Sequence, residues 1–481
     1  MIELAAVSFV AALFLGGVVV LREPRLLLPI VVLGLPIEYF ATVTLDDFGG
    51  GGVAGAVRAL LVPGKAAMLA TVVVAIVRSR NNLSQLFPDS AVLLPIVALM
   101  SVMLIGLGWS DSLLPPNSLL ILPMYVAFVF AAPTLIEDRR DFERIWGAMF
   151  AIAIVLALIA VVQRFGVFNW RGILIQSDEV SYRSNATFGD PNILARYFAV
   201  VIPLAVMLIL GTGPRRLTLY LAVPACVFGL AGIVATASRS GWLMLLIVGF
   251  LAVMWSPLTR YTKVALTVAA FAGVGMLLAL LMVQGGADAQ RVQTLWSGVE
   301  VIGQREFLIR AGLAMWRDNL LIGVGSGNYQ HALVVSYLDL IPTWARTTLS
   351  HTSTVSILAE LGIVGGALFT FVAARIAIVI TSTFRSSGDP YKKLITGWLG
   401  ASLLGILLHT QSEGRLLDEP YLWFLLAMFV AMETGGRTLA TVRVPSGAVR
   451  ASAQGVGAGE RRPAAAATRV LDGRSAAPTV D

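Results

Sequence analysis

The chain has 481 residues, of which 57% are hydrophobic and 13% are charged. A soluble globule of this size could not cover so much apolar surface, so the composition excludes a soluble fold and predicts a polytopic membrane protein. The formal net charge is +7, and the residues after Thr434 contribute four of these charges, because seven arginines there face three acidic residues. Such a basic, alanine-rich tail is typical of a solvated segment attracted to anionic lipid and does not favour nucleic-acid binding.

Apolar runs long enough to cross a bilayer follow one another along the chain. The expected spans are residues 2–21, 26–40, 59–77, 91–108, 119–136, 145–165, 192–211, 217–236, 240–256, 263–283, 352–381, 394–410 and 420–433. The first run lacks a basic start and a small-residue cleavage site, so we expect a retained span and not a signal peptide. The fold class predicted is an all-α integral membrane bundle of about 12 to 14 transmembrane helices.

Basic residues recur in every second connection between the expected spans. They include Arg22 and Arg25, Arg78 and Arg80, and then Arg139, Arg140 and Arg144. The positive-inside rule makes these connections cytoplasmic. The alternate connections, among them 166–191, 238–240 and 284–350, then face outward. We therefore expect a multi-pass protein of the cell inner (cytoplasmic) membrane.

The connection at residues 284–350 is mostly hydrophilic and much longer than the others. An enzyme acting on a lipid-linked substrate needs such an ordered insert at the membrane surface, whereas a channel or carrier rarely does. The predicted parts are an N-terminal membrane bundle (1–283), an extracytoplasmic loop domain (284–350), C-terminal membrane helices (351–434) and a disordered basic cytoplasmic tail (435–481).

Arg239 lies between two apolar runs with almost no loop, directly after Ser238. Ser238 is a good candidate N-cap for the next helix, and the free N–H groups of a first helical turn carry partial positive charge. Together with the guanidinium they predict a site for a membrane-held anion. The alternative is a boundary arginine whose side chain reaches to the headgroups.

The insert contains a second candidate region. Leu313, Trp316 and Leu320 recur at helical spacing, which predicts an amphipathic helix with Arg310 and Arg317 on a neighbouring face. The other insert arginines, Arg291, Arg305 and Arg346, are expected in ordinary surface ion pairs, because the insert has as many acidic residues as basic ones. The glycine-rich stretch 323–327 predicts a tight connection that allows close backbone approach.

His351 lies at the outer boundary of an expected span, directly after the insert. With an ordinary pKa of about 6.5, an imidazole can take a proton from a sugar hydroxyl. Glu360 is nine residues further on, so it points to the opposite side of the same helix. It is either a buried carboxyl satisfied by a neighbouring helix or a functional group. His409 is a reserve candidate at another outer boundary, and His331 is expected in a loop.

No metal-binding motif of the HExxH or Cys-x-x-Cys type occurs in the chain. The only cysteine, Cys226, excludes an internal disulfide and a cysteine-based zinc site. A mechanism that uses a divalent metal is therefore disfavoured.

Four motifs in order resemble the O-antigen ligase family, which also includes O-antigen polymerases and protein O-oligosaccharyltransferases. They are Arg183-Ser-Asn-Ala-Thr-Phe-Gly-Asp-Pro-Asn192, Ser238-Arg239-Ser-Gly, Arg310 with Asp318 to Tyr329, and His351 to Gly362, within residues 180–365. The resemblance implies a GT-C-like helical glycosyltransferase without metal or other cofactor. It would take a glycan from undecaprenyl diphosphate, on the periplasmic face of the bilayer, and pass it to an acceptor lipid, glycan or protein.

The resemblance also implies roles for particular residues. Arg239 and Arg310 would hold the substrate diphosphate, and His351 would be the catalytic base for the acceptor hydroxyl. Arg183, Arg317 and Glu360 would be accessory. Three alternatives remain open from the sequence: a polymerase of the same family, a transporter of anionic solutes, and a membrane scaffold without chemistry.

Overall fold

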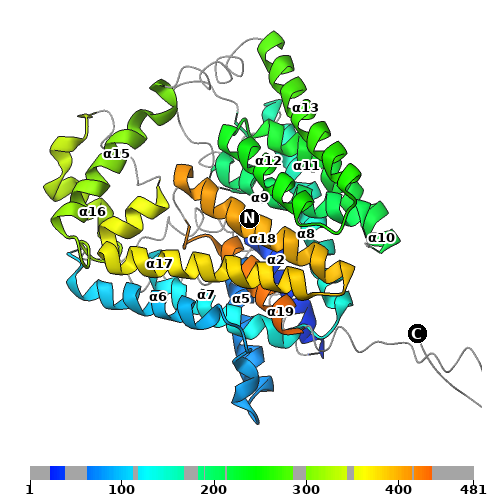
Figure 1. The fold of residues 1–481 in the computed structure, drawn as a ribbon, viewed down its shortest axis with the longest axis horizontal. Coiled ribbons are helices and arrows are strands. Elements are labelled where there is room, and N and C mark those ends of the chain that lie inside the picture. The colour runs from blue at the N-terminus through cyan, green and yellow to red at the C-terminus, as the bar shows by residue number, and fades with distance from the viewer. Residues whose placement is uncertain are drawn as a thin grey trace, which may run out of the picture. The chain divides into compact units, whose positions relative to one another are not determined.

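The computed structural model of the chain describes residues 22–37, 62–111, 117–166, 183–188, 190–211, 214–284, 299–343, 352–413 and 416–435. All of them belong to one compact unit, Met1–Leu439 (Figure 1). The second unit, Ala440–Asp481, lies outside the described residues, as do the predicted first span and nearly all of the predicted tail.

The described residues form helices and no strands, which confirms the predicted fold class. The α-helices are α2 (Leu27–Gly34), α5 (Pro63–Arg78), α6 (Leu93–Gly106), α7 (Asn117–Ala131), α8 (Arg139–Arg164), α9 (Pro191–Leu210), α10 (Arg215–Leu217), α11 (Val223–Ala235), α12 (Arg239–Met254), α13 (Arg260–Gln284), α15 (Val299–Asp318), α16 (Tyr329–Ser336), α17 (Ser353–Ser386), α18 (Pro390–Glu413) and α19 (Pro420–Thr434). The 3₁₀ turns are η1 (Pro24–Leu26), η2 (Leu35–Ile37), η3 (Leu83–Leu86), η4 (Leu107–Trp109), η5 (Ala132–Leu135) and η7 (Leu338–Leu340), and η6 (Thr218–Ala222) is a π-helical turn.

Five of these helical segments are long and apolar enough to cross a membrane: Arg139–Arg164, Pro191–Leu210, Thr218–Ala235, Ser353–Ser386 and Pro390–Ser412. Shorter apolar helices lie at Pro24–Ile37, Leu93–Trp109, Ile121–Leu135, Arg239–Met254 and Pro420–Thr434. The protein is therefore a multi-pass membrane protein. The total of 12 to 14 spans stays a prediction.

Helix α9 lies at the centre of one group of helices. It packs against α11, α12 and α18, and α8 packs against α11 (Figure 1). The approach of α12 to α9 requires glycine at position 241, because a Cβ atom there would lie 2.3 Å from the Cβ of Ala195. The first turn of α12 is thus held directly against α9.

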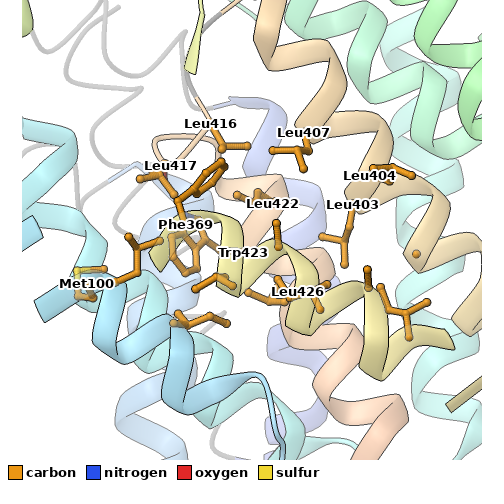
Figure 2. A pocket seen from close by; sticks show the side chains of 18 of the residues that line it. Met100, Phe369, Leu403, Leu404, Leu407, Leu416, Leu417, Leu422, Trp423 and Leu426 are labelled. Atoms are coloured by element: carbon orange, nitrogen blue, oxygen red, sulfur yellow. The ribbon is translucent and has the colours of Figure 1, made fainter. Parts of the chain in front are cut away.

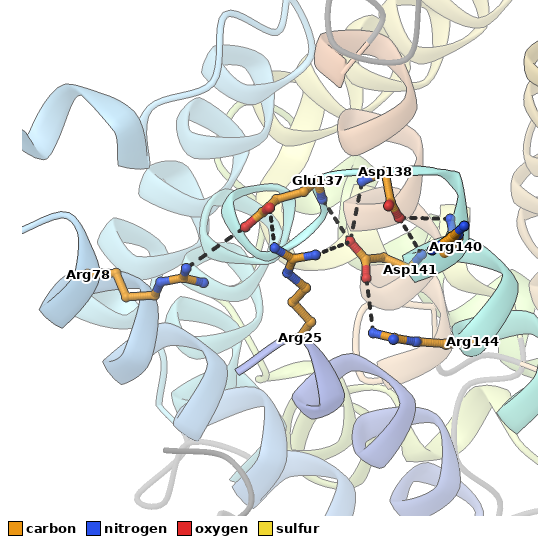
Figure 3. A network of polar contacts seen from close by, with 7 residues as sticks. All are labelled: Arg25, Arg78, Glu137, Asp138, Arg140, Asp141 and Arg144. Carbon is orange, nitrogen blue, oxygen red and sulfur yellow. Dashed lines mark hydrogen bonds and ion pairs between the residues drawn. The ribbon is translucent and has the colours of Figure 1, made fainter. Parts of the chain in front are cut away.

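Helix α8 connects two chemically different ends of the bundle. Its N-terminal end carries an ion network in which Glu137 pairs with Arg25, and buried Asp141 lies 3.9 Å from Arg25 and 3.5 Å from Arg144 (Figure 3). Its other end reaches the turn at residues 183–188, where the Gln163 side chain accepts a hydrogen bond from the Ala186 amide at 2.8 Å. A helix of this length spans about 39 Å, more than the roughly 30 Å hydrocarbon core of a bilayer.

Helix α17 breaks at Gly362, which has φ 63° and ψ −159°. The break leaves backbone N–H and C=O groups without a partner in the helix, and these form hydrogen bonds with the glycine-rich turn. The amide of Ile363 donates to the Leu320 carbonyl at 2.9 Å, and the amide of Val324 donates to the Ala359 carbonyl at 2.9 Å. At Gly323 a Cβ atom would lie 2.3 Å from the backbone of residue 360. The close backbone approach predicted for this turn is therefore confirmed.

The described part of the insert has a small core of its own. Helices α15 and α16 share a cluster of buried apolar side chains separate from the main core, and α17 contributes one residue to it: Leu308, Ala311, Met315, Tyr329, Ala332, Leu333, Ile341 and Ala359. The predicted helix is present as α15. Its predicted apolar stripe is only partly covered by the protein, because Leu313 is 40% exposed and Leu320, just after the helix, is 49% exposed. The helix has two apolar stripes, and contacts with α16 and α17 decide which one is buried.

Candidate functional site

A cleft of about 510 Å³ is lined by residues of α9, α12, α13, α15 and α18 and of the turns that precede α9 and α12. Its polar lining is Arg183, Asn192, Arg239, Ser240, Arg305, His409 and Ser412. Its apolar lining includes Trp242, Leu243, Met244, Leu246, Ile247, Val274 and Leu408. The cleft therefore places three guanidinium groups next to a surface of apolar side chains.

Arg183 lies near the N-terminal end of α9 and is held there by two hydrogen bonds. Its Nε donates to the Thr236 carbonyl at 3.1 Å, and its Nη2 donates to Oδ1 of Asn192 at 2.7 Å. The same Asn192 oxygen accepts a hydrogen bond from the Ser238 hydroxyl at 2.7 Å. One amide oxygen thus ties the Arg183 motif to the residue that caps α12.

Arg239 is the first residue of α12. Ser238 occupies the N-cap position, as predicted, and its hydroxyl accepts a hydrogen bond from the Gly241 amide at 3.2 Å. The side chains of Arg239 and Ser240 then line the cleft. Backbone N–H groups at a helix start and a guanidinium group on the same turn are a suitable combination for binding an anion.

Helix α15 contributes Arg305 to the cleft, and not Arg310. Arg310 is 67% exposed and pairs with Glu306, and Arg317 is 80% exposed and lies 3.4 Å from Asp318. Five residues along a helix turn the side chain by about 140°, so positions 305 and 310 cannot face one site. Arg305, expected in a surface ion pair, has no ion-pair partner among the described residues.

His351 lies outside the described residues, but the residues that follow it are held against the end of α18. The Thr352 hydroxyl donates to the Gln411 carbonyl at 3.3 Å, and the Ser353 hydroxyl donates to the Thr410 carbonyl at 3.2 Å. Helix α18 lines the cleft with His409 and Ser412 in the same turn. The start of α17 is therefore anchored beside the cleft wall.

Glu360 faces the start of α16. Its carboxylate accepts hydrogen bonds from the amides of Gly327 at 2.9 Å and Tyr329 at 3.2 Å. Tyr329 is the first residue of α16, so its N–H has no partner within the helix, and Gly327 directly precedes the N-cap residue Asn328. Of the two interpretations left open by the sequence, this geometry supports a carboxyl satisfied by a neighbouring helix.

A buried ionic cluster that the sequence analysis did not anticipate lies behind the cleft. Arg196 of α9 is 2% exposed, and its Nη1 lies 2.9 Å from a carboxylate oxygen of Glu419. Its Nε donates to Nδ1 of His409 at 3.2 Å. A charged residue inside an apolar span is a recognisable signal, because such residues are rare and are paired when they occur.

A second cavity, of about 280 Å³, lies on another part of α18 (Figure 2). Its walls come from α6, α7, α17, α18 and α19 and from the 416–417 turn, and Figure 2 shows leucines, Phe369 and Trp423 around it. None of the described residues that line it is charged. It can hold hydrocarbon but offers nothing to bind a diphosphate.

Within the described residues, no group of three or more histidine, cysteine or acidic side chains is arranged to hold a metal ion. The charged side chains that the described residues contribute to the 510 Å³ cleft are all arginines, which cannot ligate a metal. The described lining is therefore suited to an anion and not to a cation.

Residues 224–370 match the Wzy_C family model, described as O-Antigen ligase. The chain contains an O-antigen ligase domain. The match confirms the resemblance stated above and runs from α11 into α17, so it includes Arg239, Arg305 and His351. Arg183, Asn192 and His409 complete the cleft from outside the matched segment. No curated protein matches the chain.

The O-antigen ligase domain implies membrane glycosyltransferase activity of the O-antigen ligase or polymerase type, with lipid-linked glycans as the general class of substrate.

Proposed function

We propose that the protein transfers a glycan from undecaprenyl diphosphate to an acceptor hydroxyl, and that the reaction takes place in the cleft between α9, α12, α15 and α18. The observation that carries this proposal is the lining of the cleft. Three guanidinium groups can bind a diphosphate, and the adjoining wall of Leu243, Leu246 and Ile247 can contact a prenyl chain. No soluble sugar donor needs that combination.

The proposed reaction is a substitution at the anomeric carbon of the donor sugar. The acceptor oxygen forms a bond to this carbon, and the bond from the carbon to the diphosphate oxygen breaks. The electron pair of the broken bond stays on the diphosphate, whose negative charge therefore grows as the reaction proceeds. Arg239 and Arg305 would stabilise that growing charge, which is the condition for lowering the barrier. The resemblance gives the second role to Arg310, but Arg305 is the α15 arginine in the cleft.

His351 is the base in this proposal and takes the proton of the acceptor hydroxyl as the new bond forms. The anchoring of Thr352 and Ser353 beside Thr410 and Gln411 supports this role, because it fixes the neighbouring backbone next to the cleft wall. Arg183 would be an accessory contact to the diphosphate. With guanidinium groups neutralising the leaving group, we propose a reaction without a metal ion.

We further propose that the cleft opens on the extracytoplasmic side. The Arg25, Arg78 and Arg144 network and the 183–188 turn lie at opposite ends of α8. Because arginine-rich connections stay in the cytoplasm, the cleft end would face outward. Helices α15 and α16, with their own small core, would form the predicted extracytoplasmic domain at residues 284–350.

The proposal is tested with the purified full-length protein in liposomes, using an undecaprenyl-diphosphate-linked glycan and an acceptor lipid or glycan. Transfer is measured for the unmodified protein, for Arg239→Ala and for His351→Ala. We expect each substitution to abolish transfer nearly completely while the protein remains folded. Full activity in both variants would remove the proposed site.

A polymerase that joins repeat units uses the same donor and the same cleft, and the family match covers both types. The two differ in the acceptor. A cell that lacks a polymerase makes short glycans, whereas a cell that lacks a ligase makes full-length glycans that stay on the prenyl carrier. The glycan profile of a deletion strain therefore separates them.

A further inference from the structure

Three buried side chains from different parts of the fold form a chain of contacts that ends at the cleft. Glu419, Arg196 and His409 are each at most 4% exposed. Arg196 contacts Glu419 at 2.9 Å through Nη1 and donates from Nε to Nδ1 of His409 at 3.2 Å. His409 in turn lines the cleft together with the three arginines.

These contacts determine where the histidine carries its proton. A guanidinium group has five N–H donors and no acceptor, so Nδ1 of His409 must accept and has no hydrogen of its own. The proton of the neutral ring is then on Nε2. The position of one ring proton is commonly set in this way by the hydrogen bond at the other nitrogen. Glu419 holds Arg196 in place and so fixes both the ring and its tautomer.

The Nε2 atom of His409 has no hydrogen-bond partner among the described residues, although it is buried. Buried N–H groups are nearly always paired, so an unpaired one on a cleft wall points to a ligand. The three guanidinium groups in the same lining restrict that ligand to an anion with oxygen acceptors. The apolar wall beside them fits the lipid part of such a molecule.

We propose that His409 is a neutral hydrogen-bond donor to a diphosphate oxygen of the lipid-linked substrate, and that Arg196 and Glu419 are positioning residues that act through it. This inference rests on the proposed function. The neutral N–H adds direction without a further positive charge, so it would orient the diphosphate relative to Arg239 and leave the guanidinium groups to neutralise it.

Two substitutions separate a ligand contact from a purely structural role. In His409→Asn, the amide oxygen replaces Nδ1 and still accepts from Arg196, but the donor at the Nε2 position is lost. In His409→Gln, the amide nitrogen replaces Nε2 and keeps a donor at that position. We expect His409→Asn to bind undecaprenyl diphosphate roughly tenfold or more weakly, and His409→Gln to bind it much better than His409→Asn. Binding is measured on purified protein in liposomes, with His331→Asn, at an exposed position of α16, as the matched control.

Unchanged binding in His409→Asn, with the expected loss in Arg239→Ala, would overturn the inference and leave the proposed function intact. Failure of the unmodified protein to bind the diphosphate would instead overturn both.

A measurement on unmodified protein covers the case in which the variants do not fold. The chain has three histidines, so nitrogen-15 labelling of histidine gives few signals. We expect a protonated Nε2 on His409 whose signal shifts when undecaprenyl diphosphate is added; a protonated Nδ1, or no shift at saturation, would contradict the proposal.

Discussion

A carboxylate oxygen of Glu360 accepts the backbone amide of Gly327 at 2.9 Å, across 33 residues of sequence. The other oxygen accepts the amide of Tyr329. One side chain of a membrane helix therefore caps a helix of the insert. This relationship, and the cleft beside α12, lead to four predictions.

Removing the Glu360 carboxylate should destabilise the protein more than it impairs the chemistry. Glu360→Ala leaves the partly buried amides of Gly327 and Tyr329 unpaired, at a cost of about 1 kcal/mol each. We expect a clearly lower melting temperature in detergent, and a smaller drop for Glu360→Gln, which keeps one acceptor oxygen. A catalytic carboxylate would behave differently: Glu360→Gln would lose its activity and keep its melting temperature.

Arg305 and Arg310 should differ strongly in their effect on transfer. Arg305 lines the cleft, whereas Arg310 is exposed and paired with Glu306. We expect Arg305→Ala to lower kcat/KM for the lipid-linked donor by on the order of a hundredfold, the usual effect of removing one group that stabilises developing charge. Arg310→Ala should change it by less than about threefold, because an exposed ion pair contributes little. The reverse ranking would return the second diphosphate contact to Arg310.

The contact between Gly241 and Ala195 should be sensitive to a single methyl group. Gly241→Ala places a Cβ atom 2.3 Å from that of Ala195, so α12 must move away from α9. We expect a loss of stability of about 1 to 3 kcal/mol, as is typical for overpacking, and a reduced rate because Arg239 moves with the helix. The compensating double variant Gly241→Ala, Ala195→Gly should recover much of both losses. Independent effects of the two substitutions in this cycle would argue against direct contact.

The proposed orientation can be checked by labelling cysteines from outside the cell. Cys226 is the only cysteine, so Cys226→Ser gives a background without thiols. In that background Val335→Cys, at an exposed position of α16, should react with an impermeant thiol reagent in intact cells or spheroplasts. Leu83→Cys, in the exposed turn after α5, should react only after permeabilisation. Labelling of both positions from the same side would refute the proposed placement of α16 and this turn on opposite sides of the membrane.

Most helices could be predicted from the sequence because the spans are long apolar runs with local start signals. The expected span at 240–256 is α12 at Arg239–Met254, and its cap at Ser238 was predicted from residue type alone. The match to the O-antigen ligase family model over residues 224–370 likewise depends on motifs that are contiguous in sequence. Local patterns of this kind need no knowledge of the tertiary structure.

The arginine of α15 that faces the cleft could not be predicted in the same way. Arg305 and Arg310 both lie on an amphipathic helix with two apolar stripes, and only packing against α16 and α17 selects the stripe of Leu308, Ala311 and Met315. The Arg196, His409 and Glu419 cluster was missed for a related reason. Arg196 is 213 residues from His409 and 223 residues from Glu419, and sequence spacing carries no information about such distant contacts.

The break of α17 at Gly362 has a mechanical consequence. Main-chain atoms of residues 320–325 bond to the amides and carbonyls released there, so the segment after α15 and the long membrane helix are joined by main-chain hydrogen bonds, and glycine at positions 323 and 362 allows the close approach. Other side chains around this joint can therefore change during evolution without breaking its hydrogen bonds, as long as residues 323 and 362 remain glycine.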